Sequence, residues 1–257
     1  MADISNLSIY LSRMDAALLD KCWWIDKIPA DIDTVVDFGC ASGNLKSMID
    51  HLAPNKYKYI GVDNSSEMQA ECAKKGIRIY TSLYDAAARV ESQHTILVLN
   101  SVIHEILSYT EVDNIFKLFD QMAEYGFAYI AIRDMYLTPG IVNYKSVFAQ
   151  ILNSPYKEQW DQFQAVIQNR MGITTDPQFY TKEFLLKYWY TENWDRECKE
   201  QYLWDWKYCF DLLAGPYDIE YENDFYIPFI RNKVKQDFDY DFNVNTHKKL
   251  LLKRNDI

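Results

Sequence analysis

Two aspartates and two glycines are the residues of this sequence best suited to holding a nucleotide. Asp37 lies near the end of an apolar run, and Gly39 and Gly43 follow it closely. Glycine lets the chain turn sharply and lets a ligand approach the bare backbone. Asp63 ends a second short apolar run, where a carboxylate can accept hydrogen bonds from ribose hydroxyls. This spacing predicts a site for a nucleotide-like ligand.

A histidine and a glutamate, His104 and Glu105, could carry proton transfer. They follow Asn100 and the expected fourth strand, and the carboxyl ends of strands line the ligand crevice in open α/β sheets. Because histidine titrates near neutral pH, His104 is our candidate general base. Glu105 could orient the imidazole or bind an acceptor amine itself. The alternative is that His104 caps a helix or satisfies a buried polar group.

Strands and helices alternate along the first half of the chain, which predicts a doubly wound, mostly parallel sheet with helices on both faces. Buried parallel strands are continuous apolar runs, and glycine or proline marks helix ends. The expected strands are residues 34–38, 57–62, 77–83, 95–102 and 127–133. The expected helices are residues 7–28, 44–51, 64–75 and 110–125.

This alternation stops near residue 138. Residues 139–213 contain helical stretches dense in aromatic side chains, and two strand-like runs, 218–230 and 246–252, end the chain. We therefore expect seven strands with a helical insertion between the fifth and sixth. The expected parts are an N-terminal helix with a ligand-binding core (1–138), the aromatic-rich insertion (139–214) and the last two strands, which complete the core sheet (215–257).

Composition narrows the class of protein. The formal net charge of −10 argues against broad electrostatic capture of nucleic acid. No apolar run approaches the ~20 residues that span a bilayer, and no signal peptide is apparent. Five cysteines without a CxxC pair favour free thiols in a reducing cytosol over a disulfide framework or a zinc site. We expect a cytoplasmic protein that binds no membrane and no metal, and its oligomeric state is left open.

A stretch around the first glycine loop resembles a known family. Residues 35–43, Val-Val-Asp-Phe-Gly-Cys-Ala-Ser-Gly, resemble the first motif of class I S-adenosylmethionine-dependent methyltransferases. Residues 61–68, Gly-Val-Asp-Asn-Ser-Ser-Glu-Met, are similar to the acidic segment that follows in that family. The resemblance covers about residues 30–134. It implies a Rossmann-like seven-stranded sheet whose last pair forms an antiparallel hairpin insertion, with S-adenosyl-L-methionine as cofactor.

The resemblance also implies roles for single residues. Asp37 would orient the loop and the amino-acid end of the cofactor, and Asp63 would bind the ribose. Cys40, a small packing residue, and Ala41 belong to the same loop, and Ala41 stands where the family usually has a glycine. The other implied cofactor contacts are Gly39 and Gly43 in the loop, Asn64, Met68 and Asp85 around the adenine, and Asn100 and Ser101 near the transferable methyl.

A nicotinamide-dinucleotide site is the alternative for this loop. It requires glycines at positions 39, 41 and 44, but alanine and asparagine occupy the last two. A tight turn without a ligand is the third possibility. The loop together with the segment 61–68 favours the sulfonium cofactor over both.

The aromatic-rich insertion lies where this family often recognises its substrate. Most of its aromatic side chains are expected to pack in a core, and a minority would line an acceptor pocket by stacking or cation–π contact. The candidate acceptor-binding residues are Tyr188, Tyr190, Trp194, Glu197 and Tyr202, with Tyr10 and Arg13 of the N-terminal helix. An O or N atom of a small molecule is the favoured acceptor, since the chain is acidic. Methylation of RNA or another nucleic acid, and a non-catalytic cofactor-binding scaffold or sensor, are the alternatives.

Asp134 follows the fifth expected strand. It could in principle bind a metal, as an acid does in catechol-type methyltransferases. The sequence shows no convincing partner carboxylates, so we expect a structural role for Asp134, for instance pairing with Arg133.

Overall fold

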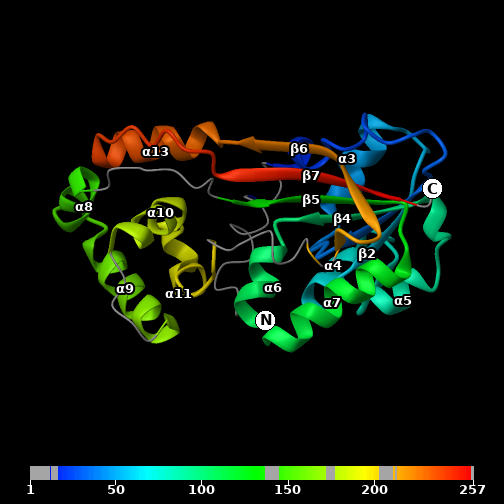
Figure 1. Cartoon of the computed structure of the whole chain (residues 1–257), viewed down its shortest axis with the longest axis horizontal. Coiled ribbons are helices and arrows are strands. Elements are labelled where there is room, and N and C mark those ends of the chain that lie inside the picture. The colour runs from blue at the N-terminus through cyan, green and yellow to red at the C-terminus, as the bar shows by residue number, and fades with distance from the viewer. Residues whose placement is uncertain are drawn as a thin grey trace.

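The computed structural model of the protein describes residues 12, 17–136, 145–171, 177–202, 211 and 213–255. In this described part, seven strands form one sheet in the order β3-β2-β1-β4-β5-β7-β6 (Figure 1). They are β1 (Thr34–Phe38), β2 (Lys58–Val62), β3 (Ile79–Tyr80), β4 (Thr95–Asn100), β5 (Tyr129–Met135), β6 (Tyr217–Phe225) and β7 (His247–Arg254). The pairs among β1 to β5 are parallel, and β7 runs antiparallel between β5 and β6. The predicted mostly parallel, seven-stranded sheet is confirmed.

Helices cover both faces of the sheet, because its strands bury side chains on both sides. Adjacent residues Val35 and Val36 are both fully buried, and successive strand side chains point to opposite faces. Val35 shares a hydrophobic cluster with Leu45, whereas Val36 shares another with Phe119. One face carries α2 (Leu18–Lys21), α3 (Asn44–Leu52) and α4 (Ser66–Lys74), and the other carries α5 (Leu83–Ala87), α6 (Ile103–Tyr109) and α7 (Val112–Tyr125). The doubly wound α/β prediction is therefore confirmed.

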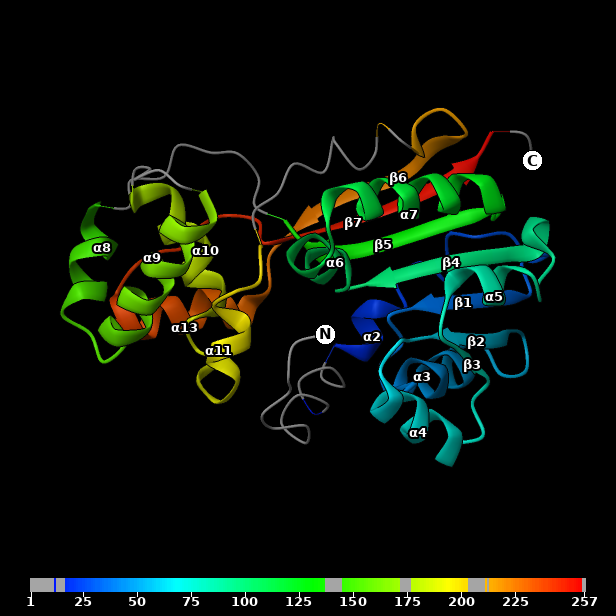
Figure 2. The ribbon, with the colours of Figure 1, turned by 90° about the horizontal axis from the view of Figure 1, so that it is seen from below.

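Five of the described helices form a separate hydrophobic cluster, which we call the cap. Figure 2 shows the cap beyond the carboxyl end of β4. Its helices are α8 (Lys145–Leu152), α9 (Lys157–Met171), α10 (Pro177–Lys187), α11 (Trp194–Glu197) and α13 (Pro228–Phe238). Trp160 and Phe184 meet edge to face inside it, with ring centroids 5.0 Å apart, an arrangement that aromatic rings prefer. Among the described helices, none has the length and apolar character needed to cross a membrane.

The strand predicted at 218–230 is wrong in its second half. β6 ends at Phe225, and α13 begins at Pro228, whose fixed φ suits the first turn of a helix. Ile230 and Val234 of α13 are buried in the cap cluster, and their spacing of four residues is helical. The last two strands pair as predicted, but a cap helix and not a tight hairpin connects them.

Two other strands are shorter than expected. β3 covers only Ile79–Tyr80, because Ser82 caps α5 by accepting a hydrogen bond from the Asp85 backbone at 3.2 Å. β4 ends at Asn100, since Ser101 adopts a φ of +55° that breaks the extended chain. The turn after β4 leads directly into α6, which carries His104.

Candidate active site

The glycine loop after β1 is folded tightly against the first turn of the chain beyond β4. Gly39 has a φ of +74°, and a Cβ there would lie 2.6 Å from Cγ2 of Val102. Gly43 has a φ of +72° and Ala41 a φ of +46°. Left-handed conformations disfavour residues with a Cβ, so Ala41 occupies a glycine-like backbone position, as the family resemblance implied. The loop bends because of these three positions.

Substitution of Gly39 by alanine is expected to destabilise the protein by more than the ~1–2 kcal/mol that a left-handed residue costs. The added Cβ must also displace the branched, stiff side chain of Val102. Gly76→Ala is the matched control, because Gly76 has a φ of +66° but open space around it. Urea unfolding of both variants separates the two costs, and equal losses would show that Val102 does not constrain the loop.

Asp63, at the end of β2, holds the glycine loop from the other side. Its Oδ2 accepts a hydrogen bond from the Ala41 N–H at 2.9 Å, and its Oδ1 accepts one from the Ser65 N–H at 2.9 Å. Burial raises the pKa of Asp63, and these two backbone hydrogen bonds oppose the rise. Each carboxylate oxygen keeps a further lone pair. Asp63 can therefore position the loop and still accept hydrogen bonds from a ribose.

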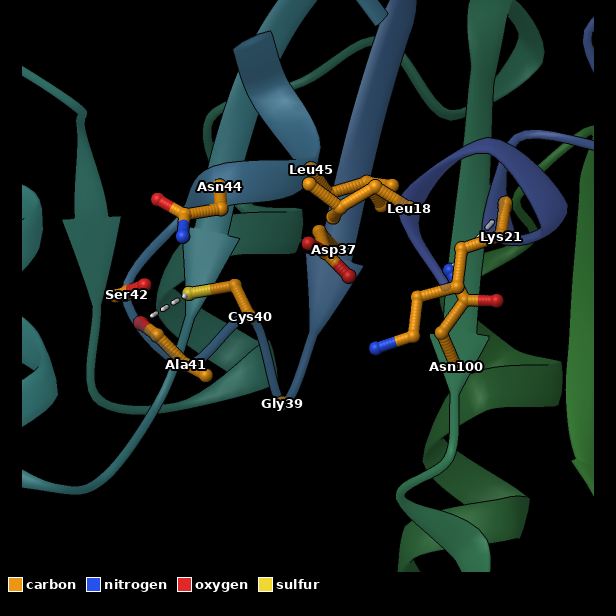
Figure 3. Close-up of a pocket in the computed structure, with 10 residues that line it drawn as sticks. All are labelled: Leu18, Lys21, Asp37, Gly39, Cys40, Ala41, Ser42, Asn44, Leu45 and Asn100. Atoms are coloured by element: carbon orange, nitrogen blue, oxygen red, sulfur yellow. Dashed lines mark hydrogen bonds between the residues drawn. The ribbon is translucent and has the colours of Figure 1, made fainter. Parts of the chain in front are cut away.

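A narrow slot of about 20 Å³ lies between the loop, α2 and the end of β4 (Figure 3). Asp37 and Asn100 line it, and Oδ1 of Asn100 is buried without a hydrogen-bond partner among the described residues. Burial raises the pKa of Asp37 to about 6, although a hydrogen bond from Tyr59 opposes this. An orphaned acceptor beside a carboxyl group suits an ammonium group such as that of a methionine moiety. Because the slot holds about one water, a larger ligand enters only if α2 and the loop separate.

The residues predicted to surround an adenine lie in and just before the helices α4 and α5. Asn64 is exposed before α4, and Met68 is buried within it. Asp85 is exposed in α5, and its carboxylate accepts a hydrogen bond from the Ser82 hydroxyl at 2.7 Å. Cys40 is buried at the loop, as a packing residue would be. The adenine contacts stay predictions.

His104 sits at the start of α6 with its imidazole held by Asp134 of β5. The Nδ1 atom of His104 donates to Oδ1 of Asp134 at 2.7 Å. The other carboxylate oxygen accepts from the backbone N–H groups of Ile103 at 2.7 Å and His104 at 3.2 Å. Asp134 therefore caps α6 and orients the ring, which leaves Nε2 to face the cap.

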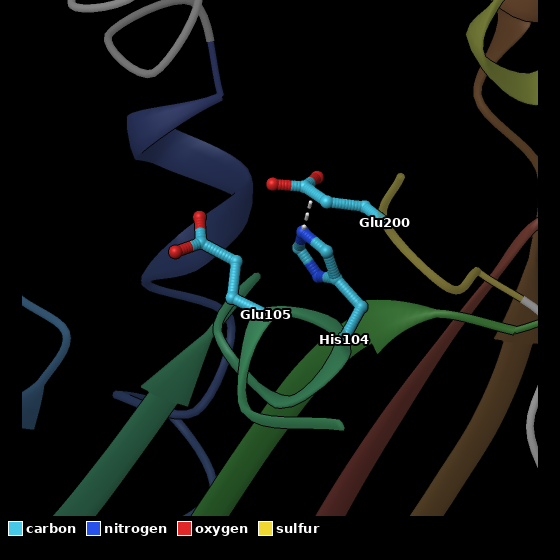
Figure 4. Close-up of side chains that lie close together, drawn as sticks. All are labelled: His104, Glu105 and Glu200. Atoms are coloured by element: carbon cyan, nitrogen blue, oxygen red, sulfur yellow. Dashed lines mark ion pairs between the residues drawn. The ribbon is translucent and has the colours of Figure 1, made fainter. Parts of the chain in front are cut away.

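Charged side chains of the cap meet His104 from the opposite side. Oε2 of Glu200 lies 3.6 Å from Nε2 of His104 (Figure 4). Arg196 bridges two carboxylates, donating through Nε to Glu200 at 2.8 Å and through its Nη2 group to Glu105. Burial alone would lower the pKa of His104, but Asp134, Glu200 and Glu105 outweigh it and raise the pKa to about 9. Burial and the neighbouring Glu197 raise the pKa of Glu200 to about 7.

Two predicted partnerships in this region are wrong. Glu105 does not orient the imidazole, because Asp134 does so and Glu105 binds Arg196. Asp134 does not pair with Arg133, which binds Asp20 through Nε at 2.5 Å. Neighbouring side chains of a strand point to opposite faces, so Arg133 and Asp134 do not pair with each other.

A cavity of about 790 Å³ separates the sheet from the cap, within the range of small-molecule sites. Its lining brings together Ser101, His104 and Glu105 from the sheet side with Glu197 and Tyr202 from the cap side. Of the other predicted acceptor residues, Tyr190 also lines the cavity, whereas Tyr188 and Trp194 are buried in the cap cluster. Tyr10 and Arg13 are outside the described residues.

Three charged residues of this cavity region were missed as functional candidates. Glu200 and Arg196 lie in the cap, in no recognisable motif. The sequence could have identified Asp134 as a site residue, because it lies at the carboxyl end of a parallel strand next to β4. The pairing with His104 across two strands was not visible in the sequence.

Within the described residues, His104, Glu105 and Glu200 are the group whose ligand atoms could hold a metal, all within 4.8 Å of one another. Two features oppose a divalent cation there. Arg196 already bridges both carboxylates, and the raised pKa of His104 keeps a proton on the ring that a metal must displace.

The sheet order, the antiparallel β7 between β5 and β6 and the glycine loop after β1 define the class I methyltransferase fold. Solved structures share this fold at low identity. The pyocyanin biosynthetic protein PhzM matches with a TM-score of 0.52 at 14% identity, over 95% of this chain and 57% of that protein. The MccD protein matches with a TM-score of 0.50 at 10% identity, over 94% of this chain and 98% of that protein. A SAM-dependent methyltransferase from Archaeoglobus fulgidus has a TM-score of 0.45 at 12% identity, over 92% of this chain and 93% of that protein. The sequence matches no protein-family model and no curated protein.

Proposed function

We propose that the protein is an S-adenosylmethionine-dependent methyltransferase that acts on an O or N atom of a small molecule. The observation that carries this proposal is the position of the slot, with Asp37 and Asn100, beside the 790 Å³ cavity. Ligands of open α/β sheets bind at the carboxyl ends of the strands, where the strand order reverses. β1 and β4 are the two strands at that reversal. The volume of the cavity is in the range of small-molecule sites, which favours a small acceptor.

The chain's own residues supply binding and alignment. Asp37 and Asn100 would hold the amino-acid end of the cofactor, and Asp63 would hold its ribose. When bound, the cofactor supplies a methyl group on a positively charged sulfur, which is already a good leaving group. The protein therefore contributes mainly by fixing the acceptor in line with that methyl. His104 faces the cavity at the end of β4 and is our candidate for contact with the acceptor.

Calorimetry with S-adenosylhomocysteine, S-adenosylmethionine and NAD tests the cofactor assignment. Asp63→Ala is expected to weaken S-adenosylhomocysteine binding by about 10- to 100-fold, because hydrogen bonds to a charged group contribute about 1.5–3 kcal/mol. Glu71→Ala, a half-exposed acid on α4 that pairs with Lys74, is the matched control and should bind normally. Binding of NAD without either sulfur ligand would overturn the proposal.

Transfer itself is tested with a methyl-labelled donor and a panel of small acceptors. Turnover separates an enzyme from a non-catalytic sensor, which would bind the cofactor and transfer nothing. For a nucleic-acid acceptor, binding would fall steeply with salt as counterions are released, whereas a small neutral or singly charged acceptor would show a shallow dependence.

A further inference from the structure

We propose that the methyl acceptor is an aromatic carboxylic acid whose carboxylate is bound by Arg133, on the side of the cavity formed by the sheet and α2. This inference rests on the proposed methyltransferase function and names the substrate class of the same cavity. Three observations carry it: the hydrogen-bond donors that Arg133 keeps, a carboxylate that two cations share, and the aromatic lining of the cavity.

Arg133 has more hydrogen-bond donors than protein partners. It is 3% exposed and lines the cavity. Among the described residues, its Nε donates to Asp20 at 2.5 Å and its Nη1 donates to the Ser101 hydroxyl at 3.2 Å. A guanidinium group has five N–H donors, so three remain, including both on Nη2. Because a buried donor without an acceptor is costly, these donors favour a ligand that brings an acceptor into the cavity.

The row of the sheet that contains Arg133 brings it no acidic side chain. Arg133 pairs with Asn100 of β4 on one side and with Lys249 of β7 on the other. Lys249 in turn pairs with Asn223 of β6. β5 and β7 lie side by side (Figure 1), and like charges directly opposite each other on such a pair are destabilising. Two cations are therefore neighbours here, and only neutral amides flank them in the row.

Asp20 of α2 is the carboxylate that these two cations share. It accepts hydrogen bonds from Nε of Arg133 and from Nζ of Lys249. Within the described part of the chain, neither cation has another ion pair. Burial raises the pKa of Asp20, but Arg133 and Lys249 outweigh it and lower the pKa below its ordinary value. One negative charge thus faces two positive charges, and a monoanionic ligand would balance the group.

The adjacent row on the same face of the sheet adds no negative charge. It consists of Met135, His247 and Phe225, all of which line the cavity. Burial, and then Arg133, His104 and Lys249, lower the pKa of His247 well below 6.5, so its ring is neutral. A neutral imidazole can still exchange a hydrogen bond with a ligand. This side of the cavity therefore has the charge and the polar atoms that an anion requires.

A carboxylate suits this position better than other charged or polar groups. The planar guanidinium fork matches both carboxylate and phosphate. A phosphate monoester carries about −1.5 to −2 charges at pH 7, which exceeds the single unmatched charge. An ammonium would add to the positive charge, and a neutral hydroxyl would leave it unbalanced. The carboxylate is the group that satisfies both the donors and the charge.

The rest of the cavity suits an aromatic body. Its remaining lining is largely aromatic: Trp189, Tyr190, Phe225, Tyr226 and Phe229. Phe229 is 57% exposed and meets Trp189 edge to face, with ring centroids 5.7 Å apart. Arg133 and Lys249 lie over the ring of Phe225, with Cζ and Nζ 5.6 and 4.6 Å from its centroid. The cationic group thus adjoins the aromatic wall, so one aromatic acid can contact both.

Binding of matched ligand pairs to the wild-type protein tests the inference without relying on turnover. With saturating S-adenosylhomocysteine at neutral pH, hydroxybenzoates and hydroxyphenylacetates are compared by calorimetry with the corresponding neutral amides. The carboxylates are expected to bind at least about tenfold more tightly, because their hydrogen bonds from Arg133 are charge-assisted. Equal affinity, or binding of neither, would overturn the inference. Tighter binding of phenyl phosphate than of any carboxylate would overturn it in favour of a phosphate site.

Substitutions of Arg133 decide whether this residue provides the preference. Arg133→Gln should remove it while leaving the affinities for the amides and for S-adenosylhomocysteine unchanged. Arg133→Lys keeps the charge but not the planar fork, so the preference should fall by at least about threefold without vanishing. Arg89→Gln, at an exposed site just after α5, is the matched control and should keep the full preference.

The contrary outcomes of this series are distinct. A preference that survives Arg133→Gln would overturn the inference. If that variant does not fold in urea unfolding controls, an unchanged preference in Arg133→Lys would overturn it instead. Weakening of S-adenosylhomocysteine as large as that of the carboxylates would mean that Arg133 holds the carboxylate of the cofactor, which also overturns the inference. If S-adenosylhomocysteine fails to bind the wild-type protein, the proposed function fails first.

Discussion

Replacement of Asp134 by alanine is expected to lower the free energy of unfolding by about 3–5 kcal/mol, the usual cost of removing one partner of a buried ion pair. The carboxylate is fully buried. It accepts hydrogen bonds from the backbone of Ile103, His104 and Met135 and from Nδ1 of His104. Alanine leaves all these donors without this acceptor and removes the nearest counter-charge of a buried imidazolium, so that Glu200 and Glu105 remain. Urea unfolding at pH 7 measures the loss.

Two further variants separate the effects of Asp134. Asp120→Ala, at an exposed position of α7, should change the stability by no more than about 0.5 kcal/mol. Asp134→Asn keeps the shape but places an amide NH₂ against N–H donors, so a loss of about 1–3 kcal/mol is expected. In that variant the pKa of His104 should fall from about 9 toward 6.5 in an NMR titration. An unchanged pKa would show that Asp134 does not set the charge of the ring.

The sheet could be predicted because its signals are local. Each of the first strands is an apolar run followed by a turn. Consecutive apolar residues such as Val35 and Val36 indicate a strand that is buried on both faces, and no information from distant segments is needed. α13 could not be predicted in the same way. The apolar residues 227–230 suit either a strand or a helix, and only their packing in the cap cluster selects the helix.

The two halves of the candidate site also differ in how far the sequence predicts them, because only one half is built from local signals. The glycine loop and Asp63 are adjacent to strand ends, and Asp63 contacts the Ala41 backbone through the register of β1 and β2. The sequence therefore placed them together. The partners of His104 come from the neighbouring strand and from the cap, 30 and 96 residues away in the chain. No local pattern reports such pairs, because they form only when the cap docks against α6.

Substitution of Glu200 by glutamine is expected to change how the stability depends on pH. The pKa of Glu200 is raised from 4.5 to about 7, first by burial and then by Glu197, so the folded protein binds this proton more tightly than the unfolded chain. Its stabilising effect is complete below pH 4.5 and is lost as the pH rises through 7. A shift of this size corresponds to about 3 kcal/mol.

In Glu200→Gln this loss of stability cannot occur, since the amide of glutamine does not ionise in this pH range. The variant should therefore gain about 2–3 kcal/mol relative to wild type between pH 4.5 and pH 7, a range that ends before most of the His104 titration. Urea unfolding at several pH values measures this difference in the free energy of unfolding. For Glu158→Gln, at an exposed site on α9, the difference from wild type should not change with pH. A constant difference across the range would mean that Glu200 is ionised throughout. A gain would show that the wild-type protein retains a destabilising carboxylate at neutral pH.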